Sequence, residues 1–524
     1  MALLLAAACV ACTRGGTTRS GPPHVLRIAY AGDPASLVPL VAIDQEILAL
    51  DALFCQTLIG LSADNRNVPI LATRVPTRRN GDVSADGTRI TYHLRPDARF
   101  ADGSAVTSAD VAFTYRAIFD PRNRATSVEP YRRIASLQTP DAHTVVIRLR
   151  GPWNAAVGTL FAQADYVYGI LPQHAFADTK VVGTAWENAP FCSGPFRVAR
   201  WLRGDRIILE PNPYYRPRPK LERIVFQIVP NLNSNFVSLR SGAADVGTLT
   251  PENVSQAESM PGLAVRRIPE NATRLLYLQT QLSPTRDRRV RQAIASALDY
   301  RQLADAWRHE YAAASSFLPP PIVHWKSVVI QPYTYDPIAA ARLLDSAGWR
   351  VRHGTRYKDG TVLGGLIGVN SEDPINVRIA TIVQTQLAAL GMQFSIKANP
   401  TRIWFSPEGL LRNGKASIAG ETWVGGGDPE GSLNLRCVQA VKGDSNHSFY
   451  CSPRLEALFE DQSRTPSESQ RARDLNEIQV LVHDDAPVIP LYYEDRLMGL
   501  SRRVTGYNLN MLWLPVNPEM WDAR

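Results

Sequence analysis

The stretch Gly420–Cys451 holds the residues best suited to recognising a ligand. Within it, Trp423 is followed by three consecutive glycines, Gly425, Gly426 and Gly427. Glycine has no Cβ, so its backbone can come close to a ligand or to another part of the chain. An aromatic wall beside bare backbone is typical of a recognition pocket. The same residues also fit a surface turn with Trp423 in a core, and the local sequence leaves both interpretations open.

The cysteines offer a second kind of chemistry. Cys437 and Cys451 lie 14 residues apart, and in an oxidising compartment a disulfide between them would stabilise the fold by about 3 kcal/mol in the chain-entropy model. Cys55 and Cys192 could also pair, which sequence does not decide. Beyond the leader, residues 1–12, the chain has no CxxC, no HExxH and no Cys/His cluster, so we expect neither a metal site nor a cofactor.

Residues for catalysis are harder to find. A hydrolase needs a nucleophile with a base, or a paired acid and base, and no GxSxG is present. His483-Asp484-Asp485 falls within a predicted helix, where it fits a solvated last turn. The glycines at 425–427 lack the GK[ST] of a phosphate-binding loop. We therefore expect no enzyme, and keep an exported hydrolase as the less favoured alternative.

Length and composition set the frame for these residues. With 524 residues, the chain is too long for one core, so two or three domains are expected. Hydrophobic content of 45% and charged content of 20% describe an ordinary folded protein. The net charge of +8 comes from scattered Arg residues without a basic run, so we expect no nucleic-acid partner.

The N-terminus predicts export. Residues 1–12 are apolar, too short to span a bilayer, and fit the end of a secretory signal. Small residues before Cys12 (or Cys9) suggest a lipoprotein-type site with that cysteine acylated, while an ordinary cleaved leader remains an alternative. Residues 13–25 are predicted to form a flexible tether. The protein is expected in the periplasm or at the outer face of the cytoplasmic membrane, free or lipid-anchored.

Strands and helices alternate along the rest of the chain, which indicates an α/β fold. Expected strands are Val25–Tyr30, Thr88–Leu94, His143–Leu149, two strands within Pro190–Pro211, Ile224–Val229, Arg274–Thr280, Gly364–Val369, Gln393–Ala398 and Pro487–Tyr493. Expected helices are Thr107–Asp120, Asn233–Ser241, Arg288–Trp307, one capped by Asp336 and stopped at Gly348, Asn376–Leu390, and one opened by a Thr465–Glu468 capping box and running to Asp485. A new unit is expected to begin after Ala272.

Several of these pieces resemble a known family. The relevant stretches are Leu94–Ile118 with Asp102-Gly103 and Ala109-Asp110-Val111, Ser193–Phe196 followed by Asn212–Tyr215, Val290–Ile294 with Ala297 and Asp299, and Pro487–Tyr493. In this order they resemble the family 5 extracellular solute-binding proteins, the dipeptide-, oligopeptide- and nickel-binding receptors of ABC importers. The Cys437–Cys451 loop is similar to that of the dipeptide-binding branch.

The resemblance implies a two-lobed periplasmic-binding-protein-like fold of type II, with an extra subdomain and a ligand cleft between the lobes. Lobe one would comprise 26–270 and 487–524, with the subdomain at about 61–188, and lobe two would comprise 271–486. The function implied is capture of a small solute, an oligopeptide or peptide-like molecule, and its delivery by a monomer to a membrane permease. The alternative is a non-peptide ligand such as a sugar, an opine-like conjugate or a metal chelate.

The resemblance also implies ligand contacts. Besides Trp423 and the glycines at 425–427, it points to Asp33 and Leu37 on the first loop and to Tyr277 and Gln279 on the hinge strand, where the family usually has an Asn. Each of these four side chains could instead serve packing or a turn.

One position departs from the family pattern. Peptide-binding members carry a carboxylate just after the Trp, which pairs with the amino terminus of the ligand. Here glycines stand at those positions, and Asp428 fits the Asp-Pro that follows, with a structural role in a turn or cap. Losing such a charge-assisted hydrogen bond weakens binding of an α-amine by about 1.5–3 kcal/mol.

Overall fold

The computed structural model describes residues 21–42, 45–164, 167–229, 231–305, 312–318, 330–432 and 434–524. The predicted leader with Cys9 and Cys12, and the tether up to residue 20, lie outside the described residues. No helix in the described ranges is long and apolar enough to cross a membrane.

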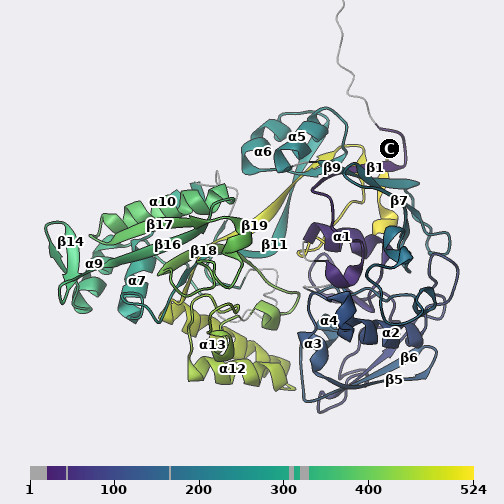
Figure 1. Cartoon of the computed structure of the whole chain (residues 1–524), viewed down its shortest axis with the longest axis horizontal. Helices are drawn as coiled ribbons and strands as arrows, with labels where there is room; N and C mark the ends of the chain where they lie inside the picture. The colour runs from purple at the N-terminus through teal and green to yellow at the C-terminus, as the bar shows by residue number, and fades with distance from the viewer. Residues whose placement is uncertain are drawn as a thin grey trace, which may run out of the picture.

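One mixed sheet runs through the whole molecule. Its strand order is β17 (Gln393–Asn399), β16 (Gly364–Asn370), β18 (Ile418–Val424), β11 (Leu263–Leu278), β19 (Val488–Ser501), β10 (Val246–Thr248), β1 (Val25–Ala31), β9 (Arg223–Val229), β8 (Arg206–Pro211) and β7 (Phe196–Leu202), with the short β12 (Ala312–Ala313) also on β19. β16 to β18 and β1 to β9 lie at opposite ends of the molecule, and the long strands β11 and β19 connect them (Figure 1).

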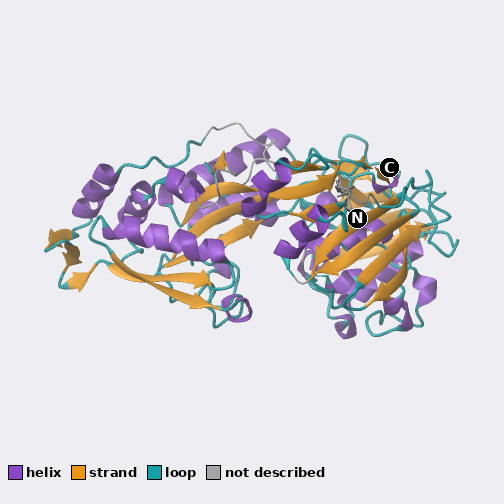
Figure 2. Ribbon diagram, turned by 90° about the horizontal axis from the view of Figure 1, so that it is seen from above, coloured by secondary structure: helices purple, strands orange, loops and turns teal. Residues whose placement is uncertain are grey.

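Buried side chains divide the molecule into two lobes. One core runs from Leu26 to Phe226 and resumes with Met498 to Ala523. Two adjoining cores are built between Leu275 and Tyr492. We call the first part the first lobe and the second part the second lobe. This two-lobed α/β architecture is the predicted fold class, and the two bodies are separate in the view from above (Figure 2).

Smaller sheets and the helices complete the lobes. The small sheets are β4 (Arg89–His93), β6 (Thr144–Leu149) and β5 (Ile134–Asp141); β2 (Ile59–Leu61) and β3 (Asn67–Pro69); β20 (Val504–Thr505) and β21 (Asp522–Ala523); and, in the second lobe, β13 (Arg350–Arg352), β14 (Thr355–Lys358) and β15 (Thr361–Val362). Helices of the first lobe are α1 (Gln45–Phe54), α2 (Ser108–Phe119), α3 (Glu129–Arg132), α4 (Ala156–Thr159), α5 (Leu232–Arg240) and α6 (Pro251–Glu258). Those of the second lobe are α7 (Arg288–Ala297), α8 (Tyr300–Asp305), α9 (Pro337–Ser346), α10 (Pro374–Ala388), α11 (Thr401–Trp404), α12 (Pro453–Arg464) and α13 (Glu468–Asp485).

Two helix predictions were wrong in their bounds. The helix expected over 288–307 breaks at Leu298, which has an extended backbone, and Asp299 then receives the amide of Arg301 at the start of α8. The expected Thr465 capping box is absent because Thr465 is the C-cap of α12, a helix that the sequence reading missed. Ser467 caps α13 instead, by accepting from the amide of Gln470.

Two disulfides cross-link the described chain. The predicted Cys437–Cys451 bond is present, and the undecided pair Cys55–Cys192 also forms a bond, across 137 residues of sequence. The cap predicted at Asp336 is present too, since its side chain accepts from the amide of Ala339.

The strand pair β11–β19 has a bulge where it passes between the lobes. Pro269 pairs with Asp495 and Thr273 pairs with Tyr493, so β11 has two extra residues at this point. Glu270 and Asn271 are the buried polar residues of this bulge. Burial raises the pKa of Glu270 to about 8, with Glu494 and Asp495 adding to the rise and Arg496 and a hydrogen bond to Trp513 opposing it.

This shift predicts a pH dependence of stability. Because the folded protein favours protonated Glu270, this residue lowers the free energy of unfolding as the pH rises from its ordinary pKa of 4.5 towards 8. We expect Glu270→Gln to raise the melting temperature by several degrees at pH 8.5 and by much less at pH 4.5, measured by circular dichroism. Glu222→Gln, at an exposed position, is the control. A Glu270→Gln difference that is equal at both pH values would contradict the prediction.

Candidate functional site

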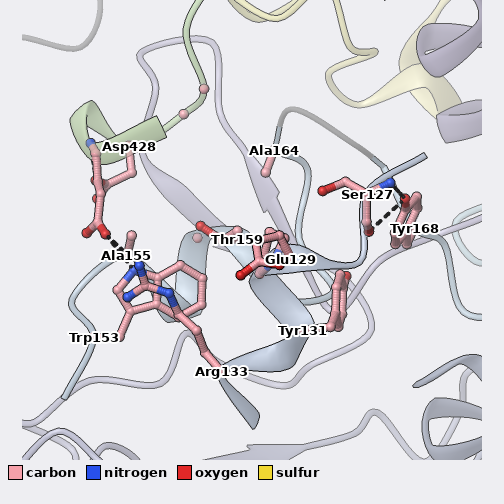
Figure 3. A pocket seen from close by; sticks show the side chains of 15 residues that line it. Ser127, Glu129, Tyr131, Arg133, Trp153, Ala155, Thr159, Ala164, Tyr168 and Asp428 are labelled. Atoms are coloured by element: carbon pink, nitrogen blue, oxygen red, sulfur yellow. Dashed lines mark hydrogen bonds and ion pairs between the residues drawn. The ribbon is translucent and has the colours of Figure 1, made fainter. Parts of the chain in front are cut away.

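A cavity of about 310 Å³ lies between the two lobes. The first lobe supplies residues from 127–133 and 153–168, which include α3 and α4, and the second lobe supplies residues from 426–430. Figure 3 shows this cavity, with Asp428 on one side and the first-lobe side chains facing it. Both lobes therefore form its walls.

The second-lobe wall is largely backbone, from Gly426 and Gly427. A Cβ added at Gly427 would lie 2.8 Å from Cδ1 of Leu61 in the first lobe, so a larger residue would force Leu61 to move. Asn65 of the first lobe donates from Nδ2 to the carbonyl of Gly427 at 3.4 Å. The glycines thus permit a close approach of the two lobes.

Asn271 fixes this glycine segment to the bulge between the lobes. Its carbonyl accepts from the amide of Gly425 at 2.9 Å, and its Nδ2 donates to the carbonyl of Gly426. Asn271 is fully buried, and its own amide donates to the carbonyl of Met511 at 3.2 Å. The position of the wall is therefore coupled to the backbone of the bulge.

Aromatic residues form the first-lobe wall. The guanidinium carbon of Arg133 lies 4.6 Å from the ring centre of Trp153, a cation–π arrangement (Figure 3). Tyr131 and Tyr168 stack at 5.7 Å between ring centres. The hydroxyl of Tyr168 receives the amide of Ser127 at 2.6 Å and donates to the carbonyl of Ser127 at 3.0 Å. Tyr131 and Tyr168 are 4% and 1% exposed, so they belong to the first-lobe core and expose little surface to the cavity.

Glu430 is the carboxylate where the lobes meet. Its Oε1 accepts from Nε1 of Trp153 and from the hydroxyl of Ser463, each at 3.1 Å, and lies 3.6 Å from the guanidinium of Arg133. Burial raises the pKa of Glu430, and neighbouring Asp428 raises it further, while Arg133 opposes the rise.

Asp428 has the structural role expected of it. Its carboxylate pairs with the buried guanidinium of Arg471 at 2.6 and 2.9 Å, and its Oδ1 also receives the amide of Glu430 at 2.9 Å. Both oxygens are thus engaged within the second lobe.

A second cavity, of about 860 Å³, lies on the other side of the segment 153–157. Trp153 lines both cavities, and residues 466–469 at the start of α13 line the second one.

The family match follows this geometry. Residues 67–442 match the sequence model of the bacterial extracellular solute-binding proteins, family 5. The chain belongs to this family. Its members are binding proteins that work outside the cell.

Relatives and a solved structure match this chain over most of its length. Di/tripeptide-binding protein 4 of Pseudomonas aeruginosa is 29% identical over 460 residues, covering 82% of this chain and 83% of its own length. Heme-binding protein A of Haemophilus influenzae is 25% identical over 453 residues, covering 81% and 80%. The crystal structure of NikA from Brucella suis in complex with Fe(III)-EDTA superposes with a TM-score of 0.82 at 21% identity, covering 95% of this chain and all (100%) of that one. The solved structure supports the fold alone.

The structure places the predicted ligand contacts in three settings. Gly426 and Gly427 line the cavity, and Gly425 adjoins them through its bond to Asn271. Trp423 packs, half-buried, against the second-lobe core, and its Nε1 has no hydrogen-bond partner among the described residues.

The remaining four candidates lie elsewhere and serve internal contacts. Asp33 accepts from Nε1 of Trp201 and from the amide of Gly204, and so anchors the turn of the β7–β8 hairpin to the loop after β1. Leu37 is fully buried in the first-lobe core. Gln279 is buried and donates to the carbonyl of Gly414 at 3.3 Å.

Tyr277 is likewise buried, edge-on to His447 at 5.0 Å between ring centres. His447, the histidine nearest in sequence to the glycines at 425–427, is largely buried in turn. Burial, with a smaller contribution from Arg412, lowers the pKa of His447 to about 4, so its imidazole is neutral at pH 7.

Sequence reasoning missed four residues of the site: Arg133, Trp153, Asn271 and Glu430. The first two come from the first lobe, more than 250 residues before the glycines, and no local spacing links them to the pocket. Asn271 had a usable signal, because the resemblance implies an Asn at the hinge and Asn271 stands immediately before the unit boundary expected after Ala272.

The described residues His174 and His483 do not form the arrangement that a hydrolase needs. Ser104, Asp102 and His174 lie together, but the serine hydroxyl and the carboxylate both meet Nε2 of His174, at 3.3 and 2.6 Å. A catalytic triad instead places the carboxylate on Nδ1 and the hydroxyl on Nε2. His483, which lies in α13, stacks on Tyr333 with 4.2 Å between ring centres.

The ion pair behind the glycine wall gives a stability prediction. Asp428→Asn keeps the shape but leaves the buried charge of Arg471 without its carboxylate, so we expect a loss of about 3–5 kcal/mol in the free energy of unfolding. Urea unfolding measures it. The double variant Asp428→Asn/Arg471→Gln should recover part of the loss. A loss below about 1 kcal/mol in the single variant, the size of an exposed pair, would show that the pair contributes little.

Proposed function

We propose that this protein is an exported receptor that captures a small solute between its two lobes and delivers it to the permease of an ABC importer. The observation that carries the proposal is the cavity between the lobes, with backbone of Gly426 and Gly427 on one side and Trp153 on the other. Ligand pockets of binding proteins commonly combine apolar walls with a few placed polar groups.

We propose a peptide or peptide-like molecule as the ligand. Relatives named for di- and tripeptides support this, and the amides of Gly426 and Gly427, which line the cavity, can donate to the carbonyls of a peptide main chain, while their own carbonyls already accept from Asn271 and Asn65. The family carboxylate for an α-amine is replaced by glycine here, and Asp428 is bound to Arg471. Recognition would therefore rest on backbone and rings more than on a charge pair. The same observation supports a non-peptide ligand, such as a sugar, an opine-like conjugate or a metal chelate, as second candidate.

We also propose how the chain is arranged outside the cell. A cleaved or Cys12-acylated leader would place a monomeric receptor in the periplasm or at the outer face of the cytoplasmic membrane. The expected lobes are 26–270 with 487–524, carrying the subdomain at 61–188, and 271–486. Because Ile489, Leu491 and Tyr492 pack in the second-lobe core, we place the second crossing at Tyr493 rather than at residue 487.

A thermal-shift screen tests the ligand class. The leader-less protein would be mixed with di-, tri- and pentapeptides, oligosaccharides, opine-like conjugates and nickel chelates. A ligand at 100 times its dissociation constant stabilises the native state by about 2.7 kcal/mol, so we expect peptides to raise the melting temperature by several degrees. A shift from another class alone would overturn the peptide assignment and keep the receptor, while silence across all classes would count against a small-solute receptor.

Gly427→Ala tests the location of the site. The added methyl would meet Leu61 at 2.8 Å, so the lobes could not approach as closely and we expect a ligand found in the screen to bind about tenfold more weakly. Gly420→Ala on β18 is the matched control, since a methyl there meets its neighbours only at 3.5 Å. Isothermal titration calorimetry measures both. Equal affinities of the two variants would place the ligand elsewhere.

A further inference from the structure

Asn154 of the first lobe binds the end of a second-lobe helix. Its backbone amide donates to the carbonyl of Ser463 at 2.9 Å, and its Nδ2 donates to the carbonyls of Gln462 and Thr465, each at 2.8 Å. These carbonyls belong to the C-terminal end of α12, where a helix leaves oxygens without partners in its own backbone. Asn154 therefore caps α12 from across the cleft.

Trp153 makes a second contact of the same kind. Its ring belongs to the first-lobe core, while its Nε1 donates to Glu430 of the second lobe at 3.1 Å. The guanidinium of Arg133 lies over the ring and also faces Glu430 at 3.6 Å. Two successive residues thus bind two different elements of the opposite lobe.

The position of this pair matters more than its strength. Trp153 and Asn154, which we call the cross-lobe bridge, stand between the cavity of about 310 Å³ and the one of about 860 Å³. Trp153 lines both, and Asn154 lines the second. The two cavities therefore meet at Trp153 of the bridge.

We propose that the cross-lobe bridge limits the length of the ligand, so that the protein takes compact molecules the size of a di- or tripeptide and excludes longer peptides. This rests on the proposed function. A cavity of about 310 Å³ is at the small end of ligand pockets. An extended peptide needs 3.3–3.6 Å per residue, so a nonapeptide spans about 30 Å and would have to run through the bridge into the second cavity.

The bridge itself is tested without any ligand, by hydrogen exchange of the leader-less protein. The amide of Asn154 is bound to the carbonyl of Ser463, so we expect it to exchange far more slowly than an exposed amide. Exchange of this amide at the rate of an unstructured chain would mean that the lobes are not bridged in solution, and would overturn the proposal.

The length limit is tested with random peptide libraries of two, three, five and nine residues, read by native mass spectrometry. The wild type should retain di- and tripeptides, and about tenfold less nonapeptide than Asn154→Ala or Trp153→Ala. Asn413→Ala is the matched control, because its Nδ2 also donates to a backbone carbonyl, that of Glu408, but within one lobe. It should behave as the wild type.

The outcomes separate the two proposals. A wild type that retains nonapeptides as readily as tripeptides overturns the length limit and leaves the receptor function intact. So does a wild type limited to short peptides whose Asn154→Ala and Trp153→Ala variants gain no longer ones, because the limit would then lie elsewhere. If none of the folded proteins retains a peptide of any length, the peptide function fails, and the length limit fails with it.

Discussion

Both lobes depend on one pair of antiparallel strands, β11 and β19. Each strand contributes to the core of the second lobe at one end and to the first-lobe side of the sheet at the other. The bulge between Pro269 and Thr273 interrupts the pairing of the two strands where they pass from one lobe to the other. Asn271 in that bulge is hydrogen-bonded to Gly425 and Gly426. A change in the angle between the lobes would therefore move one wall of the cavity directly, because hinge and wall share hydrogen bonds.

The charges around the cavity are largely satisfied within the protein. Arg471 engages Asp428, while Arg133, Trp153 and Ser463 surround Oε1 of Glu430. Burying such groups is costly unless they are paired, which explains why each stands beside a partner. Oε2 of Glu430 is the exception, since it is buried and has no hydrogen-bond partner among the described residues. A ligand consequently meets rings, peptide groups and this one oxygen, and selection would depend on shape and on the geometry of hydrogen bonds.

Local patterns predicted much of the fold and little of the site. Strands β1, β9, β16 and β17 follow from short runs rich in β-branched or alternating apolar residues, and the Asp336 cap follows from Asp-Pro before an apolar helix. The sequence did not predict the break at Leu298, because the helical spacing of apolar residues continues through that residue. In the site, the glycine wall could be predicted from composition, but Trp153 and Glu430 meet only because the lobes come together, and no spacing in one chain encodes that meeting.

Trp153 also gives the molecule an optical property. An indole emits according to its surroundings, and this one donates its N–H across the cleft while lining the cavities on both sides. Filling either cavity or parting the lobes would alter the polarity around the ring. The native protein therefore carries an intrinsic fluorophore where its two lobes meet, although nine other tryptophans share its emission band.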